Sequence, residues 1–156
     1  MNAAKKHRIR LIGRREFVSI PELGISGIEA KVDTGAYTSS LHCEKIKVEI
    51  EEGREILYFT IDPGIESRLF RFEDFARKKI KNTSGYMEER YVINTIVNIG
   101  KKSIRSIISL SNRDTMRYPL LIGRRLLKNK FLIDVNRIHT GGITMRKLIK
   151  EIATKI

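Results

Sequence analysis

Short apolar segments separated by turn residues fill the chain from Arg10 to about Asn112, and they restrict the possible fold more than any other feature. Ile46, Val48 and Ile50 alternate with charged residues, as expected of a strand with one buried face and one wet face. Few stretches in this part of the chain have a helical period. The pattern therefore predicts a mostly β domain.

Turn residues mark where the expected strands begin and end. Gly100-Lys101 and Asp62-Pro63-Gly64 are two such turn signals. The expected strands are IRLIGRREFVSI (9–20), GIEAKVD (27–33), CEKIKVEIEE (43–52), REILYFTID (54–62), RLFRFEDF (68–75), RYVINTIVNIG (90–100) and KSIRSIISLS (102–111).

The pattern changes after Pro119. The segment LLIGRRLLKNKFLIDV (120–135) predicts a short strand, a short helix and a returning strand. In the tail TGGITMRKLIKEIATKI (140–156), apolar residues at spacings of three and four predict a basic amphipathic helix. This helix could pack on its own domain, contact a second copy of the chain, or bind an anionic surface. We expect a domain at 1–140 and a helical tail at 141–156.

Composition indicates the class of protein. One domain accounts for 156 residues, of which 41% are hydrophobic. No apolar window of about 18 residues is present, so no membrane-spanning helix is expected. The basic N-terminus lacks a secretory cleavage pattern, and the single cysteine, Cys43, excludes an internal disulfide. These features favour a globular protein of the cytoplasm.

The chain is strongly basic, with a formal net charge of +13. Residues 1–15 hold six Lys or Arg and no acid, so the surface should attract polyanions. The charge could serve solubility with weak, non-specific and salt-sensitive RNA contact, or it could mark a dedicated nucleic-acid site. No RNA-binding signature with interleaved aromatic residues is present, which favours the first interpretation.

The segment AKVDTGAYTSSLH (30–42) is the strongest candidate for chemistry. It places Asp33 directly after an apolar run and directly before a polar turn. Gly35 permits a tight turn, so a rigid support would present the carboxylate, and Thr34 with the small residues after it can orient that carboxylate. On these residues alone, Asp33 could be catalytic or could belong to a structural turn.

The chain resembles the retropepsins, the single-domain aspartic proteases, in the order of its segments. That order is VDTGAYTSSL, a hairpin, YVINTIVNIGKKSIRSIISL and LLIGRRLL. The chain is also similar to a bacterial and archaeal retropepsin-like family labelled ATP-dependent zinc proteases, some of which are associated with RimK-type ATP-grasp ligases. The motifs that carry this similarity are GRREFVSIPELGISGIEAKVDTGAYTSSLH, SGYMEERYVI and NRDTMRYPLLIGRRLL. The resemblance implies a closed β-barrel with one short helix after the Gly-Arg motif. It also implies a homodimeric aspartic endopeptidase that cuts a peptide or protein substrate.

Carried over to this chain, the resemblance implies roles for individual residues. Asp33 would be catalytic, Thr34 would brace the turn against the partner chain, and Gly35 would allow the turn. Support of the site would come from Ala36, Gly123 and Arg124. The segment NTSGYMEER (82–90) would be the flap, with substrate-binding residues Ser84, Gly85, Tyr86, Glu89 and Arg90.

Two points of this carry-over leave alternatives. Retropepsins usually follow Asp-Thr-Gly-Ala with an aspartate that pairs with the arginine of Gly-Arg, but this chain has Tyr37 there, so Arg124 must find another partner. Glu89 and Arg90 could bind the substrate backbone or form a cross-strand ion pair on the hairpin.

The implied mechanism requires two carboxylates close enough to share a proton and activate water. Asp62, Asp74, Asp114 and Asp134 lack the glycine that follows Asp33-Thr34, so the second carboxylate must come from a second chain.

We expect no metal and no nucleotide cofactor. The candidate zinc ligands His7, His42, Cys43 and His139 form no metal-binding motif, and no phosphate-binding loop is present. Ser39 and Ser40 lack the pattern of a serine nucleophile and are expected to hydrogen-bond the turn after Asp33. The rival hypothesis is an inactive retropepsin-like module that binds or regulates a RimK-type ligase, or binds the acidic-tailed protein substrate of that ligase.

Overall fold

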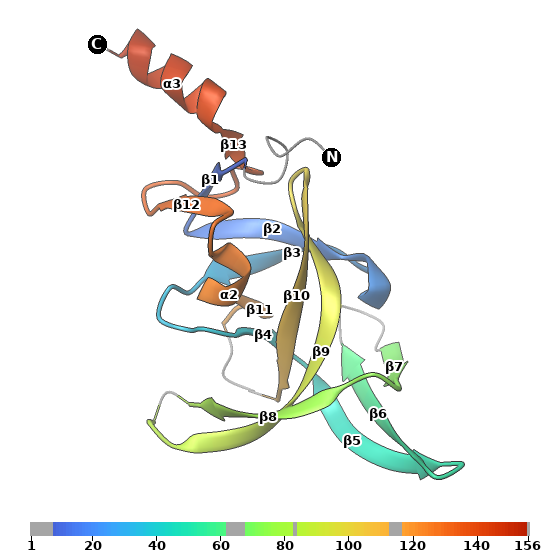
Figure 1. Cartoon of the computed structure of the whole chain (residues 1–156). Coiled ribbons are helices and arrows are strands. Elements are labelled where there is room, and N and C mark those ends of the chain that lie inside the picture. Colours follow the sequence, from blue (N-terminus) through green and yellow to red (C-terminus); the bar gives the residue numbers. More distant parts are fainter. Residues whose placement is uncertain (1–7, 62–67, 83, 113–116, 156) are drawn as a thin grey trace.

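Six strands close into a barrel in the computed structural model, which describes residues 8–61, 68–82, 84–112 and 117–155 (Figure 1). The ring closes because β9 pairs with both β2 and β10. In ring order the strands are β10 (Lys102–Ser111), β4 (Ser39–His42), β11 (Leu120–Ile122), β3 (Ile25–Val32), β2 (Arg15–Ile20) and β9 (Met87–Ile99). The prediction of a mostly β, closed barrel is therefore confirmed.

Strand β8 (Ala76–Lys81) continues this sheet as the antiparallel partner of the N-terminal half of β9. Two smaller sheets flank the barrel, and a 3-10 helix, η1 (Pro21–Leu23), joins β2 to β3. One sheet contains β12 (Phe131–Asp134), β1 (Arg10–Gly13) and β13 (Ile143–Thr144). The other contains β5 (Glu44–Glu51), β6 (Arg54–Ile61) and β7 (Arg68–Phe72).

The barrel interior is filled by aliphatic side chains that alternate with outward-facing residues along each strand. On β11, for example, Leu120 and Ile122 are fully buried whereas Leu121 between them is half-buried. Ile122 lies beside Val32, because β11 runs parallel to β3. The core thus fixes the end of β3, the strand that leads into Asp33.

Some strands differ from the sequence-based expectation. Residues 9–20, expected as one strand, divide at Arg14 into β1 and β2, which belong to different sheets. Gly13 ends β1 at a tight contact, because an added Cβ there would lie 2.2 Å from the Arg137 carbonyl oxygen. Strands β4 and β8 were not expected, because SSLH and ARKKIK contain few apolar residues. The expected turn at 62–64 lies outside the described residues.

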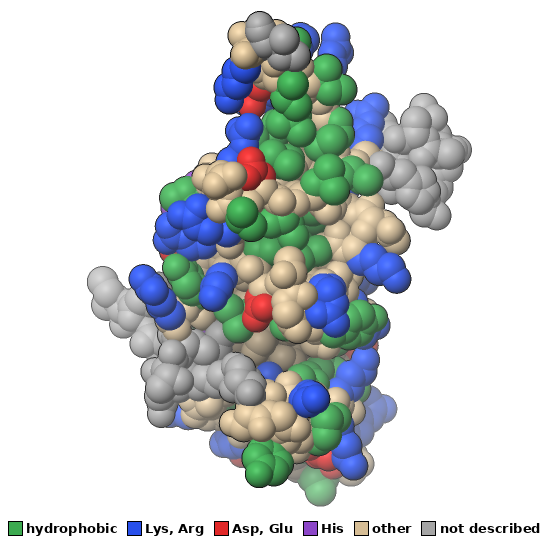
Figure 2. All heavy atoms as spheres, turned by 90° about the vertical axis from the view of Figure 1, so that its left-hand side faces the viewer, with side chains coloured by type: hydrophobic (Ala, Val, Ile, Leu, Met, Phe, Trp, Pro, Cys, Tyr) green, Lys and Arg blue, Asp and Glu red, His purple; other side chains and the backbone are tan. Residues whose placement is uncertain are grey.

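The expected helices are both present, as α2 (Arg124–Leu127) after Gly123 and α3 (Met145–Thr154) near the C-terminus. An ion pair connects α3 to the segment after β12, because Arg137 Nη2 donates to Glu151 Oε2 at 3.0 Å. None of its side chains is buried, and Ile149 is 65% exposed. Hydrophobic side chains gather along this helix and continue onto the body below it (Figure 2). Within the described ranges, no helix is long and apolar enough to cross a membrane.

Candidate active site

The loop after β3 presents Asp33 from a fixed backbone. Asp33 N donates to the carbonyl of Ile122 at 2.8 Å, which extends the β3–β11 pairing by one residue. Gly35 N donates to Asp33 Oδ1 at 3.0 Å, so the carboxylate is oriented by its own turn. Asp33 is half-buried, whereas Thr34 and Gly35 beside it are exposed. This arrangement leaves the carboxylate open on one side.

The Gly123–Arg124 segment holds this loop from behind. Arg124 N donates to Ala36 O at 2.8 Å, and Gly123 N donates to Ser39 Oγ at 3.0 Å. Gly123 is required here by space, because a Cβ at this position would lie 2.7 Å from the Tyr37 carbonyl oxygen. The structure therefore brings together three elements that are far apart in sequence: the ends of β3 and β11 and the start of β4.

Arg124 finds its partners on the Asp33 loop itself. Its Nη1 donates to the carbonyl oxygen of Thr34 at 2.9 Å. The guanidinium carbon also lies 5.8 Å from the centre of the Tyr37 ring, which is within cation–π range. Arg124 was expected to find a partner other than the aspartate usual in retropepsins, and Tyr37 and a backbone carbonyl are those partners. Both contacts fix the turn that contains Thr34 and Gly35.

The hairpin formed by β8 and β9 carries the residues expected to form a flap. Its tip folds around Asn82, whose Oδ1 accepts hydrogen bonds from Ser84 N at 3.0 Å and Tyr86 N at 3.1 Å. Gly85 adopts a positive φ of 86°, which favours glycine. Tyr86 is 75% exposed. Asn82 was not singled out from the sequence, although an Asn shortly before Ser-Gly is a known turn signal.

Glu89 and Arg90 point to opposite faces of this hairpin, as neighbours on a strand must. Glu89 lies 3.9 Å from Arg77 Nε on β8, a cross-strand ion pair. Arg90 is buried and bonds Glu88 Oε2 through Nη2 at 3.2 Å. Glu89 thus takes part in a cross-strand ion pair and Arg90 points inward, and binding of the substrate by either residue stays a prediction.

Asp33 and Arg90 line the same cleft, which has a volume of about 620 Å³. The cleft lies between the Asp33 loop, the start of α2 and the β8–β9 hairpin. Its lining residues are Asp33, Gly35, Ala36, Tyr37, Thr38, Ser40, Lys79, Ile80, Lys81, Asn82, Arg90, Leu121 and Arg124. Ser84, Gly85, Tyr86 and Glu89 are not among the residues that line it.

The charges around this cleft are unbalanced. Asp33 is its one acidic lining residue in the described part of the chain. The basic lining residues are Lys79, Lys81, Arg90 and Arg124. The two lysines were not predicted, because the strand that carries them was not recognised from the sequence. A cleft of this kind favours an anionic ligand.

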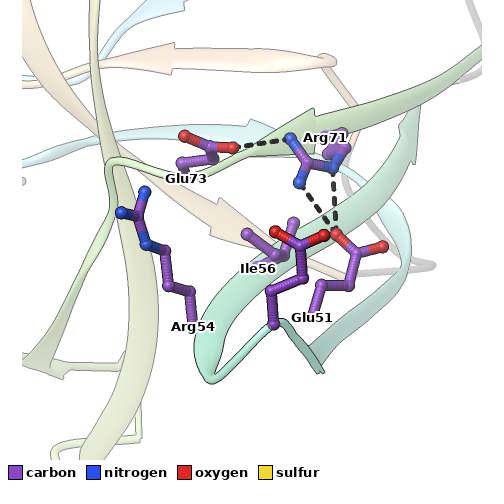
Figure 3. Close-up of a pocket in the computed structure, with 6 residues that line it drawn as sticks. Glu51, Arg54, Ile56, Arg71 and Glu73 are labelled. Carbon is purple, nitrogen blue, oxygen red and sulfur yellow. Dashed lines mark hydrogen bonds and ion pairs between the residues drawn. The ribbon is translucent and has the colours of Figure 1, made fainter.

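A second hollow, of about 570 Å³, lies at the end of the β5–β6–β7 sheet (Figure 3). Arg71 bonds Glu51 Oε2 at 2.8 Å and Glu73 Oε1 at 2.9 Å. The hydroxyl of Tyr58 donates to Glu51 at 2.6 Å, and this bond, followed by those from Arg71, lowers the pKa of Glu51. These charges satisfy one another, so the arrangement is explained as a surface ion-pair network.

The structure describes three of the four candidate zinc ligands, His42, Cys43 and His139. Cys43 is fully buried, and burial raises the pKa of its thiol. His139 Nε2 lies 2.5 Å from Glu29 Oε2, and its ring stacks on Phe17. His7 is outside the described residues. Within the described ranges, no three His, Cys, Asp or Glu side chains are close enough to hold one metal ion.

Comparisons with known proteins add evidence on ancestry. The family described as "RimB-like: Retropepsin-like aspartic endopeptidase RimB" matches residues 11–141. A Shewanella halifaxensis protein named "Probable alpha-L-glutamate ligase" is 38% identical over 128 residues, which are 80% of this chain and 28% of that protein. A Desulfotalea psychrophila protein of the same name is 39% identical over 129 residues, again 80% of this chain and 28% of that protein. The chain thus spans little more than a quarter of the length of these curated relatives.

A solved structure is also similar. The crystal structure of a Legionella pneumophila protein of unknown function aligns with a TM-score of 0.70 and 26% sequence identity. The alignment covers 85% of this chain and 98% of that protein.

Proposed function

Since the chain belongs to the RimB-like family of retropepsin-like aspartic endopeptidases, we propose that it hydrolyses peptide bonds as a homodimer with one Asp33 from each chain. The Asp33 loop is the observation that carries this proposal. Its carboxylate is oriented by Gly35 N, and its backbone is held by Ile122 and Arg124. Such a rigid, half-buried carboxylate in a cleft suits acid–base chemistry.

In the proposed dimer the two Asp33 carboxylates share one proton, because two carboxylates about 3 Å apart do not both ionise readily. The ionised carboxylate takes a proton from the attacking water. The protonated carboxyl donates a hydrogen bond to the scissile carbonyl, whose oxygen becomes negative as water adds to the carbon.

Two features support the homodimer. Among the described residues of the cleft lining, Asp33 has no second acid beside it. Helix α3 also carries an apolar stripe, which includes the exposed Ile149 and Ile152. Figure 2 views the molecule from the left-hand side of Figure 1 and shows this stripe. Helix α2 and the tip of the β8–β9 hairpin lie toward the same side in Figure 1. A second copy placed against this side would complete the site and cover the stripe.

We infer that the substrate is an acidic segment of a protein. The four basic residues of the cleft lining attract carboxylates, and the net charge of +13 acts in the same direction at longer range. Relatives named as glutamate ligases support the same inference, because such an enzyme handles an acidic amino acid. A RimK-type ligase is accordingly the proposed partner in the cell.

A second candidate function is a non-catalytic module that binds such a ligase or its acidic product. The observation that favours it is the length of the curated relatives, since the matched region forms only 28% of proteins named as ligases. In this case the cleft would bind an acidic chain without cutting it.

The test is cleavage of a peptide library, rich in acidic and non-acidic members, by wild type and Asp33→Asn from acidic to neutral pH. The fraction of dimer is measured alongside by analytical ultracentrifugation. The endopeptidase predicts cleavage by wild type only, unaffected by a chelator or by ATP. Binding of acidic peptides without cleavage, from a wild type shown to be dimeric, would instead support the binding module.

A further inference from the structure

Arg90 is a buried cation with unused hydrogen-bonding capacity. Its side chain is 5% exposed, and the one ion pair it forms with a described residue is with Glu88, which is itself 48% exposed. The Nε atom of Arg90 has no hydrogen-bond partner among the described residues. A buried donor without an acceptor is costly, and a charged one especially so. An acceptor supplied by a ligand would remove this cost.

The strand register places Arg90 on the buried face of the hairpin. On β9 it lies on the same face as Val92, which is 3% exposed, and opposite Lys78 of β8. Glu89 and Tyr91 occupy the other face, where Arg77 of β8 contacts both of them. Arg90 is thus on the inner face of the hairpin, and it lines the cleft that contains Asp33.

Ser40 is a second buried polar residue of the same cleft that lacks a partner. The residue is 5% exposed, and its Oγ has no hydrogen-bond partner within the described ranges. The neighbouring Ser39, by contrast, uses its Oγ to accept a bond from Gly123 N. The cleft therefore holds two unpartnered polar groups, one of them cationic, close to the proposed catalytic carboxylate.

We propose that Arg90 determines specificity by binding the side-chain carboxylate of an acidic substrate residue next to the scissile bond. The planar guanidinium offers a fork of N–H donors that matches a carboxylate, and its Nε–H has no partner within the described ranges. Lys79 and Lys81 attract the substrate at longer range, whereas Arg90 is held in place by burial. This inference rests on the proposed function, because it assigns a role in substrate recognition at the same cleft.

Binding to the full-length chain carrying Asp33→Asn tests the role of Arg90 without cleavage. Two fluorescein-labelled peptides of equal length and with amidated C-termini are compared by anisotropy, one containing glutamates and the other glutamines. Arg90→Gln removes the guanidinium, and Arg90→Lys keeps the charge without the fork. Arg77→Gln is the matched control, because it removes the same charge from the outer face of the same hairpin. Thermal melting checks the fold of each variant.

The expected result is a glutamate peptide that binds at least about tenfold more tightly than the glutamine peptide. Arg90→Gln should bring this ratio to about one and leave the glutamine affinity within about twofold. Arg90→Lys should give an intermediate ratio, and Arg77→Gln should retain most of it. If Arg90→Gln fails to fold, a folded Arg90→Lys with an unchanged ratio would overturn the proposal.

Other results would also overturn it. These are a ratio that survives in Arg90→Gln, a ratio that falls equally in Arg77→Gln, and no measurable binding of the glutamate peptide. A glutamine peptide with a free C-terminal carboxylate that binds as tightly as the amidated glutamate peptide would refute a side-chain carboxylate as the ligand.

Cleavage by the wild type separates this proposal from the proposed function. If Arg90-dependent binding is found but neither peptide is cut, the subsite stands and the endopeptidase fails. If both peptides are cut with equal kcat/KM, the endopeptidase stands and the subsite fails.

Discussion

Replacing the buried Glu16 should strongly destabilise the protein. Glu16 is fully buried and accepts four hydrogen bonds. Gly13 N donates to it at 2.8 Å, Gly141 N at 2.8 Å, and Thr140 donates through N at 3.1 Å and Oγ1 at 2.8 Å. The carboxylate therefore joins the β1–β2 turn to the segment that leads into β13.

The cost can be worked from these bonds. Glu16→Ala leaves four donors without an acceptor, and at about 1–3 kcal/mol each the sum would be roughly 4–12 kcal/mol. Water that enters the space and rotation of the Thr140 hydroxyl reduce this sum, so we expect Glu16→Ala to lower the free energy of unfolding by about 3–5 kcal/mol. In Glu16→Gln the amide oxygen can keep the three hydrogen bonds made to Oε2. The amide nitrogen then faces Gly141 N, and two donors cannot bond each other, so we expect the free energy of unfolding to fall by about 2 kcal/mol.

Urea denaturation followed by circular dichroism measures these differences. The control is Glu22→Ala. Glu22 is 42% exposed, and its ion pair with Arg105 is long, at 3.9 Å, so this contact should contribute about 0.5 kcal/mol or less to stability. A loss below about 1 kcal/mol in Glu16→Ala would refute the reasoning, since four buried bonds cannot be that weak. Equal losses in Glu16→Ala and Glu16→Gln would refute the division among the four bonds.

Three further predictions concern other parts of the chain. Gly123→Ala should abolish cleavage and lower the free energy of unfolding by about 2 kcal/mol or more, because the added Cβ would collide with the Asp33 loop. A variant as active and as stable as wild type would contradict this prediction. Cys43 should react with Ellman's reagent only after denaturation, because burial raises its thiol pKa, and rapid reaction of the native chain would show that the site is accessible. The pKa of Glu51 is lowered by Tyr58 and then Arg71, so this contribution to stability is present above the unfolded pKa and is lost as pH falls through the lowered value. Arg71→Gln should therefore lose less stability than wild type between neutral and acidic pH in parallel urea titrations, and an equal loss would remove Glu51 as a cause.

Much of the barrel could be predicted from local patterns, because most of its strands carry apolar residues in alternation. The short strand β11 was also predicted, since three apolar residues end at a glycine. Strands β4 and β8 could not be recognised, because polar residues dominate both. Closure of the ring depends on the parallel pairing of Ser39–His42 with Ile108–Ser111, and no local pattern specifies partners so far apart in sequence.

The candidate site was only partly accessible from the sequence. Motifs identified Asp33, Gly123 and Arg124, and the structure brings all three together. The direction of Arg90 depends on the register between β8 and β9, where a slip of one residue would turn it to the opposite face. Tyr37 as a partner of Arg124 likewise follows from the conformation of the turn and not from residue type.

Mixing of wild-type and Asp33→Asn chains tests the central claim, that one catalytic site is built from two chains, most directly. Cleavage of an acidic peptide is measured at constant total protein, after a mass tag has shown that subunits exchange freely. If both aspartates are required, an equal mixture should retain about a quarter of the wild-type activity, because only dimers of two wild-type chains are active. Retention of about half, with activity linear in the wild-type fraction, would mean that each Asp33 works alone and would contradict the account.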